Sequence, residues 1–183
     1  IRELSEISKE VEKKDVYTHG HSMRVKDYAI MIARKLNLSK ERIENLTYAS
    51  LFHDLGKIDI PDHILNKPGR LTDDEFKIIQ THPFEGIKYV EKTYYKNIAE
   101  IIHQHHERLD GSGYPRGLRE DEILLEAKII AVADTYDAMT TDRPYRQALS
   151  KEIALKELRN YSGLHYDYNI VNVFAKLILQ NGF

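Results

Sequence analysis

The sequence predicts an all-α fold, a bundle of about seven to nine helices. Apolar residues recur at steps of three and four along almost the whole chain, and no segment alternates as a strand would. Residues that favour helix starts stand in front of several of these patterns. A chain of 183 residues is long enough to bury a core, and it contains no cysteine that could form a disulfide.

The first apolar pattern is narrow. Leu4, Ile7 and Val11 follow helical spacing in the charged segment LSEISKEVEKK. A stripe of this width favours a linker or signalling helix over residues 1–14, in front of a domain over 15–183. Pairing of two chains through this helix, as a homodimer, is compatible with the pattern.

The next two patterns predict buried helices. The first begins near His21 and ends at Asn37, and Ser39 caps the helix that follows. In that second helix His53 falls on the same face as Ile43, which directs its imidazole into the core. The buried face of the first helix is formed by Val25, Ala29, Ile32, Ala33 and Leu36.

The middle of the chain has clear helix boundaries. Thr72 and Glu75 form a capping box, and Pro83 suits the first turn of the next helix, with His82 at the joint. A further stripe runs from Ile98 to His105, directly before the glycines of HQHHERLDGSGYPRG. These glycines predict that the chain turns sharply after the last helical turn.

The last third predicts three helices. LLEAKIIAVADTYDAMTT places Asp134 and Asp137 on its apolar face, where a carboxylate is seldom tolerated without a partner. Ser150 is expected to cap the following helix, Gly163 to end it, and Asp167 to cap the last one.

Seven polar side chains on inward faces or at helix ends are candidate metal ligands. Imidazole is the commonest neutral metal ligand, and without thiolates the donor set suits iron, manganese, nickel or zinc. Two adjacent ions sharing one carboxylate would match the two-metal sites that cleave phosphate esters. The alternative is a set of separately satisfied core histidines. The candidates are His21, His53, Asp54, His82, His105, His106 and Asp134.

Charge and hydropathy exclude some classes of partner. The chain has 27 Lys and Arg against 29 Asp and Glu, a formal charge of −2, which argues against duplex nucleic acid and anionic membranes. No apolar run approaches the ~18 residues of a spanning helix, and the N-terminus lacks a signal-peptide core. The sequence therefore predicts a cytoplasmic protein without a membrane segment.

Several long motifs resemble those of the HD-GYP family, a branch of the HD-domain metal-dependent phosphohydrolases. The resemblance runs from about Asp15 to Asp167. It implies an all-helical fold and hydrolysis of cyclic di-GMP to pGpG or GMP by a metal-activated hydroxide, with iron or manganese. The motifs are HSMRV, HDLGKIDIPDHILNKPGRLTDDEF, THP, HHERLDGSGYPRGL, AVADTYDAMTTDRPYR and HYD.

The resemblance also implies how the candidate ligands divide between two ions. One metal would be bound by His21, His53, Asp54 and Asp134, and the other by His82, His105 and His106, with Asp54 bridging. Some family members bind a third ion through a glutamate four residues before His21, where this chain has Tyr17, a poor ligand at neutral pH. We therefore expect two metals.

Substrate contacts follow from the same resemblance. Lys57, one turn after His53, would contact the scissile phosphate, and the alternative is a solvated lysine. Arg143 and Arg146 would bind phosphate, and Tyr114 would line the pocket. Asp137 joins this group as an acid that supports a ligand or as the partner of an arginine.

Three expectations concern the remaining histidines, the partners and the alternatives. His19, His63, His103 and His165 are expected to be structural or surface residues rather than ligands. The GYP region is a candidate docking surface for a diguanylate cyclase domain. Two alternatives to cyclic di-GMP hydrolysis are hydrolysis of another cyclic dinucleotide, such as cyclic GMP-AMP, and a receptor that binds cyclic di-GMP with negligible turnover.

Overall fold

The computed structural model describes residues 2–15, 20–93, 95–142 and 147–181. These ranges contain no β-strand, only two isolated bridges, so the predicted all-α fold is confirmed. None of the helices in these ranges is long and apolar enough to cross a membrane. The elements are α1 (Arg2–Lys14), α2 (His21–Lys35), α3 (Lys40–Phe52), the 3-10 helix η1 (Leu55–Asp59), α4 (Asp62–Leu65), α5 (Asp73–Ile79), α6 (His82–Val90), η2 (Lys96–Ile98), α7 (Ala99–Gln104), η3 (Glu120–Glu122), α8 (Leu125–Thr140), α9 (Lys151–Asn160) and α10 (Tyr168–Asn181).

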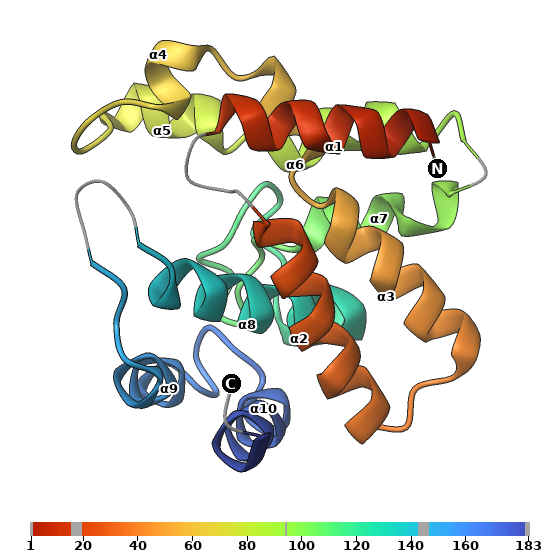
Figure 1. Ribbon diagram of the computed structural model, residues 1–183, viewed down its shortest axis with the longest axis vertical. Helices are drawn as coiled ribbons and strands as arrows, with labels where there is room; N and C mark the ends of the chain where they lie inside the picture. Colours follow the sequence, from red (N-terminus) through yellow and green to blue (C-terminus); the bar gives the residue numbers. More distant parts are fainter. Residues whose placement is uncertain (1, 16–19, 94, 143–146, 182–183) are drawn as a thin grey trace.

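The helices form one bundle around α2 and α8. Figure 1 shows α1, α4 and α5 at one end of the molecule and α9 and α10 at the other, with α2, α3 and α8 between them. The core joins these parts: Ala29 of α2, Ile130 of α8 and Phe174 of α10 are fully buried in one hydrophobic cluster. This cluster fixes α2 and α8, and both helices contribute residues to the site described below.

Most predicted helix starts are confirmed by side-chain caps. Ser39 accepts a hydrogen bond from the backbone N–H of Arg42, and Thr72 and Glu75 form the expected capping box. Asp167 accepts from the N–H of Ile170 at the start of α10. The predicted end of α9 is wrong by a few residues, because the helix ends at Asn160 and Gly163, with φ 81°, lies in the turn after it.

The apolar stripe of the lead helix α1 was expected to be too narrow for a core helix, but in the structure it packs against the core. Leu4 and Val11 are 2% and 3% exposed, and Leu4 belongs to the main hydrophobic cluster. The hydroxyl of Ser8 donates to the carbonyl of Leu51 in α3. Three apolar residues suffice because α1 lies on the compact η1 segment and α3, which bury the stripe within the chain. Pairing of two chains through α1 would therefore have to use side chains other than Leu4 and Val11.

Candidate metal centre

Most of the predicted ligands come from helix ends that meet on one side of the core. His21 is the first residue of α2, His53 ends α3, and Asp54 precedes η1. His82 is the first residue of α6, and His105 ends α7. Because a helix leaves backbone groups unpaired at its ends, side chains there can turn toward a polar centre without breaking helical hydrogen bonds.

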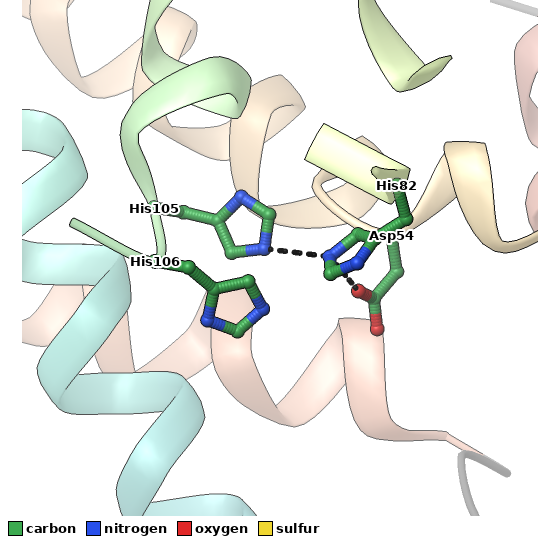
Figure 2. A group of neighbouring side chains, drawn as sticks. All are labelled: Asp54, His82, His105 and His106. Atoms are coloured by element: carbon green, nitrogen blue, oxygen red, sulfur yellow. Dashed lines mark hydrogen bonds and ion pairs between the residues drawn. The ribbon is translucent and has the colours of Figure 1, made fainter. Parts of the chain in front are cut away.

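The ligand atoms form two groups that share Asp54. One contains Asp54, His82, His105 and His106, the other His21, His53 and Asp54, and within each group the atoms lie within 4.8 Å of one another. Oδ1 of Asp54 lies 3.4 Å from Nε2 of His82, while Oδ2 lies 3.4 Å from Nε2 of His53. Figure 2 shows the first group, with the three imidazoles and the carboxylate turned toward a common centre.

Three of the imidazoles are held in the same orientation by their own backbone. Nδ1–H of His53 donates to the carbonyl of Ser50 at 2.8 Å, and the same bond to the residue three positions earlier recurs at His82 (2.8 Å) and His105 (2.6 Å). With the proton on Nδ1, the lone pair of Nε2 points into the centre.

This arrangement fits cations. Nε2 of His82 and Nε2 of His105 face each other at 3.3 Å, so two lone pairs meet with no donor between them. Nε2 of His53 is buried and has no hydrogen-bond partner in the described part of the chain. Buried acceptors that face one another are costly unless a cation or proton lies between them. Neutral imidazole and carboxylate are the donors that iron and manganese bind.

His21 is oriented by a carboxylate instead of a carbonyl. Its Nδ1–H donates to Oδ2 of Asp137 at 2.7 Å, and Arg24 binds the same carboxylate through Nε (2.6 Å) and Nη2 (3.0 Å). Asp137 is 1% exposed. Its oxygens thus contact a candidate ligand, His21, and an arginine, Arg24, which are the two kinds of partner considered from the sequence.

Asp134 of α8 lies beside His21. Its Oδ1 is 3.3 Å from Nε2 of His21, although Asp134 is in neither of the two compact ligand groups. Burial alone would raise the pKa of this carboxyl, but the hydrogen bond and charge of His21 outweigh it, and the pKa is lowered well below the usual range. Asp134 thus presents a carboxylate on the His21 side of the centre.

The protonation of the histidines differs between the two groups. Burial lowers the pKa of His82 to about 4 and also lowers the pKa of His105 and of His106, which keeps these imidazoles neutral at neutral pH. Burial opposes protonation of His21 as well, but its bonds to Asp134 and Asp137 outweigh this and raise its pKa to about 9. In the metal-free chain His21 therefore holds a proton that an ion would displace.

Lys57 lies against the shared carboxylate. Its Nζ is 2.8 Å from Oδ2 of Asp54 and 3.2 Å from Oδ2 of Asp15, the residue that follows α1. Burial would lower the pKa of Lys57, but these two carboxylates outweigh it and raise the pKa, so the ammonium stays charged. Sequence reasoning placed Lys57 here but missed Asp15. A charged residue at the end of a polar helix carries no sequence signal that its side chain reaches a distant site.

The GYP loop packs on the first ligand group, the one that contains His106. The ring of Tyr114 lies 4.7 Å from that of His106, and burial raises the pKa of its hydroxyl. Glu107, 2% exposed, accepts from the backbone N–H of Arg116 (2.8 Å) and of Leu118 (2.9 Å), which ties the loop to the end of α7. Sequence reasoning missed Glu107, although its place directly after two ligands was a signal.

A close backbone contact joins the two halves of the centre. A Cβ added at Gly56 would lie 2.0 Å from the carbonyl oxygen of His82 and 2.5 Å from the N of Gly86. Only glycine permits η1, which follows His53 and Asp54, to approach α6, which begins with His82. Gly56 was not recognised in the sequence because its neighbour is distant along the chain.

The other predicted residues do not join the centre or lie outside the described ranges. His63 is exposed, His103 lies beside Phe84, and His165 stacks on Tyr161, and none of the three belongs to either group of candidate ligands. Tyr17, His19, Arg143 and Arg146 lie outside the described residues.

Comparison with known proteins agrees with this geometry. The family model for the HD domain matches residues 6–170. The chain belongs to the HD domain family. The motifs quoted from the sequence resemble those of the HD-GYP branch of this family. Among solved structures the chain is similar in fold to a Bdellovibrio bacteriovorus protein described as an HDG"Y"P protein, with TM-score 0.72 and 24% identity over 87% of this chain and 51% of that one.

Two curated relatives are phosphodiesterases by name. A cyclic di-GMP phosphodiesterase of Thermotoga maritima is 42% identical over 91% of this chain and 46% of its own length. A 3'3'-cGAMP-specific phosphodiesterase of Vibrio cholerae is 41% identical over 83% of this chain and 33% of its own. The chain thus spans less than half of the length of these relatives.

Proposed function

We propose that this chain hydrolyses a phosphodiester of cyclic di-GMP at a site for two divalent ions, giving pGpG, GMP or both. The observation that carries the proposal is the pair of ligand groups sharing Asp54, with the ammonium of Lys57 against the same carboxylate. A 42% identical relative with the name of this activity supports the choice of substrate.

The side chains of the centre would hold the ions in two sets. His82, His105 and His106 serve one ion, His21, His53 and Asp134 the other, and Asp54 has one oxygen toward each set. When bound, such a pair activates water for attack on phosphorus and offsets phosphate charge. Iron or manganese suits these donors, with nickel and zinc as further options. We predict two ions and not three, because this chain has Tyr17 where some family members have a metal-binding glutamate. The number of ions stays a prediction.

The remaining residues would bind the substrate. The ammonium of Lys57 has three N–H donors, two of which meet carboxylates, so the third is available to a phosphoryl oxygen. Tyr114 would form the wall of the pocket beside His106, where its ring can stack on a base. The phosphate contacts of Arg143 and Arg146 stay predictions from the sequence.

Cyclic GMP-AMP is the second candidate substrate. A 41% identical relative is named as specific for it, and none of the proposed ligands reads the base. A receptor with negligible turnover is the candidate from another class. A docked diguanylate cyclase domain at the GYP loop, pairing of two chains through α1 and a cytoplasmic location stay predictions.

A product assay separates these candidates. The chain is loaded anaerobically with Fe(II) or Mn(II) and incubated with cyclic di-GMP or cyclic GMP-AMP, and the products are resolved by chromatography. We expect faster turnover of cyclic di-GMP. Faster turnover of cyclic GMP-AMP would favour the second substrate, and binding without products would favour the receptor.

Two variants test the site in the same assay. Asp54→Asn should abolish activity with an unchanged helical circular dichroism spectrum, because Asp54 belongs to both ligand groups. Asp62→Asn is the control, since Asp62 is an exposed acid whose contact is an ion pair with Lys14. Full activity of Asp54→Asn would contradict the proposed site.

A further inference from the structure

Lys57 is held by two carboxylates that come from different parts of the chain. Asp54 adjoins η1, the element that carries Lys57, whereas Asp15 directly follows α1. The side chains of Lys57 and Asp15 are 17% and 6% exposed, so water screens their contact only weakly. The position of the ammonium therefore depends on a residue of the lead helix.

The carboxylates of Asp54 and Asp15 differ in their other contacts. Both oxygens of Asp54 face the histidine groups, at 3.4 Å from His53 and from His82, so Asp54 is committed to the metal centre. Asp15 is in neither group of candidate ligands. With ions bound to Asp54, Asp15 is the carboxylate whose negative charge is left to fix Lys57, whose four-carbon stem is otherwise flexible.

The end of α1 is itself fixed to the segment around Lys57. Nζ of Lys14 donates to the carbonyl of Ile58 at 2.6 Å, and Nδ2 of Asn66 donates to the carbonyl of Lys14 at 2.8 Å. The N–H of Asp15 continues the helical pattern by bonding to the carbonyl of Val11, which is buried. A shift of α1 along η1 would thus move Asp15 relative to Lys57.

We propose that Asp15 is a positioning residue for Lys57, and that the seat of α1 on η1 acts on the reaction through this contact. Asp15 is in neither group of candidate ligands and contacts the ammonium of Lys57, so its effect on the reaction would pass through that ammonium. The position of α1 then affects the position of Lys57, since any change that moves α1 away from η1 also moves Asp15 away from Lys57. The kinetic part of this proposal rests on the proposed phosphodiesterase activity.

A double-mutant cycle tests the positioning role. Asp15→Asn is nearly isosteric but uncharged, and in the Mn(II)-loaded chain we expect kcat to fall by ~10-fold while bound manganese is unchanged. In a Lys57→Met background the same substitution should change kcat by less than ~2-fold, because the residue through which it acts is gone. Asp15→Glu, which restores the charge, should recover part of the loss.

Asp62→Asn is the matched control. Asp62 also pairs with the end of α1, through Lys14 at 3.3 Å, but its side chain is 78% exposed and does not contact Lys57. This variant should keep kcat within ~2-fold of the wild type, as exposed pairs contribute little. An equal loss in the control would show that any charge change near α1 lowers activity.

A second measurement does not need turnover. Acylation of lysines with an excess of a small anhydride, followed by peptide mass spectrometry, reports how accessible each amine is. We expect Lys57 to react several-fold faster in Asp15→Asn than in the wild type or in Asp62→Asn. If the wild-type chain hydrolyses no cyclic dinucleotide, the proposed function fails, while this measurement still decides whether Asp15 holds Lys57.

The role of α1 is tested through Lys14. Lys14→Met removes the bond to the carbonyl of Ile58, and we expect kcat to fall in the wild-type background but not in Asp15→Asn. Asp62→Asn removes only the exposed contact of Lys14 and serves again as control. The proposal is overturned if Asp15→Asn leaves kcat and acylation unchanged, or lowers kcat equally with and without Lys57. If Lys14→Met is inactive in both backgrounds to the same extent, the part concerning α1 is wrong.

Discussion

Replacing Gly56 with alanine should separate the two halves of the proposed metal centre. The added Cβ would lie 2.0 Å from the carbonyl oxygen of His82, 2.5 Å from the N of Gly86 and 2.9 Å from the carbonyl carbon of His82. All three neighbours are backbone atoms, which cannot rotate away as a side chain would. The strain must therefore be relieved by moving η1 away from α6.

The size of the effect follows from these distances. Real Cβ contacts are essentially never shorter than 3.0 Å, so the gap of 2.0 Å must open by ~1 Å. Overpacking of this kind costs about 3 kcal/mol. Because His53 and Asp54 directly precede η1 and His82 begins α6, the same shift moves His53 and Asp54 away from His82.

Gly86→Ala is the matched control, because it lies on the other side of the same contact. Its Cβ would meet its nearest atoms at 3.4 Å, and alanine in a helix gains about 0.5–1 kcal/mol over glycine. Urea denaturation and Mn(II) titration of both variants measure the difference. We expect Gly56→Ala to lose stability and metal affinity and Gly86→Ala to remain within about 1 kcal/mol of the wild type. Equal stability and affinity of the two variants would refute the reasoning.

Three further predictions concern the ligands and their supports. Metal binding at pH 7.5 should release about one proton, since the pKa of His21 is about 9 without metal, and metal affinity should rise with pH up to that value. Calorimetry in buffers of different ionisation enthalpy measures the affinity and the number of protons released. His21→Asn should abolish the release. Asp137→Asn should weaken Mn(II) binding by ~10-fold or more, measured by titration, because Asp137 orients His21. Glu107→Gln should cost about 2 kcal/mol in urea denaturation, because an amide cannot accept from both N–H groups of the loop, whereas exposed Glu120→Gln should cost little.

The helices and the ligands could be predicted from the sequence because both follow from local rules. Ser39, Thr72 and Asp167 cap the helices as expected, and His53 lies on the inward face that its spacing indicates. Most of the candidate ligands adjoin helix ends, where a change of pattern is visible along the chain, whereas Asp134 lies inside α8 and was found from its place on an apolar face. The division of the seven candidates between two ions needed the resemblance to a family, which no spacing along the chain supplies.

The features that were missed depend on contacts between distant segments. In the sequence Asp15 is one of many charged residues of a polar helix. Its contact with Lys57 is visible only when α1 is packed on η1. Gly56 reads as a turn residue until the carbonyl of His82 lies across from it. Asp137 was a candidate from the sequence, but its partners could be chosen only from the positions of His21 and Arg24.

The tautomers of His53, His82 and His105 do not depend on the identity of any neighbouring side chain. Each Nδ1 proton is fixed by a main-chain carbonyl one turn earlier, at positions 50, 79 and 102, and not by a side chain. A substitution at those positions leaves the acceptor in place unless it distorts the helix. The direction of these three candidate ligand nitrogens is thus set by helical geometry itself. His21, which depends on a carboxylate, is the one among these four whose orientation a single replacement can remove.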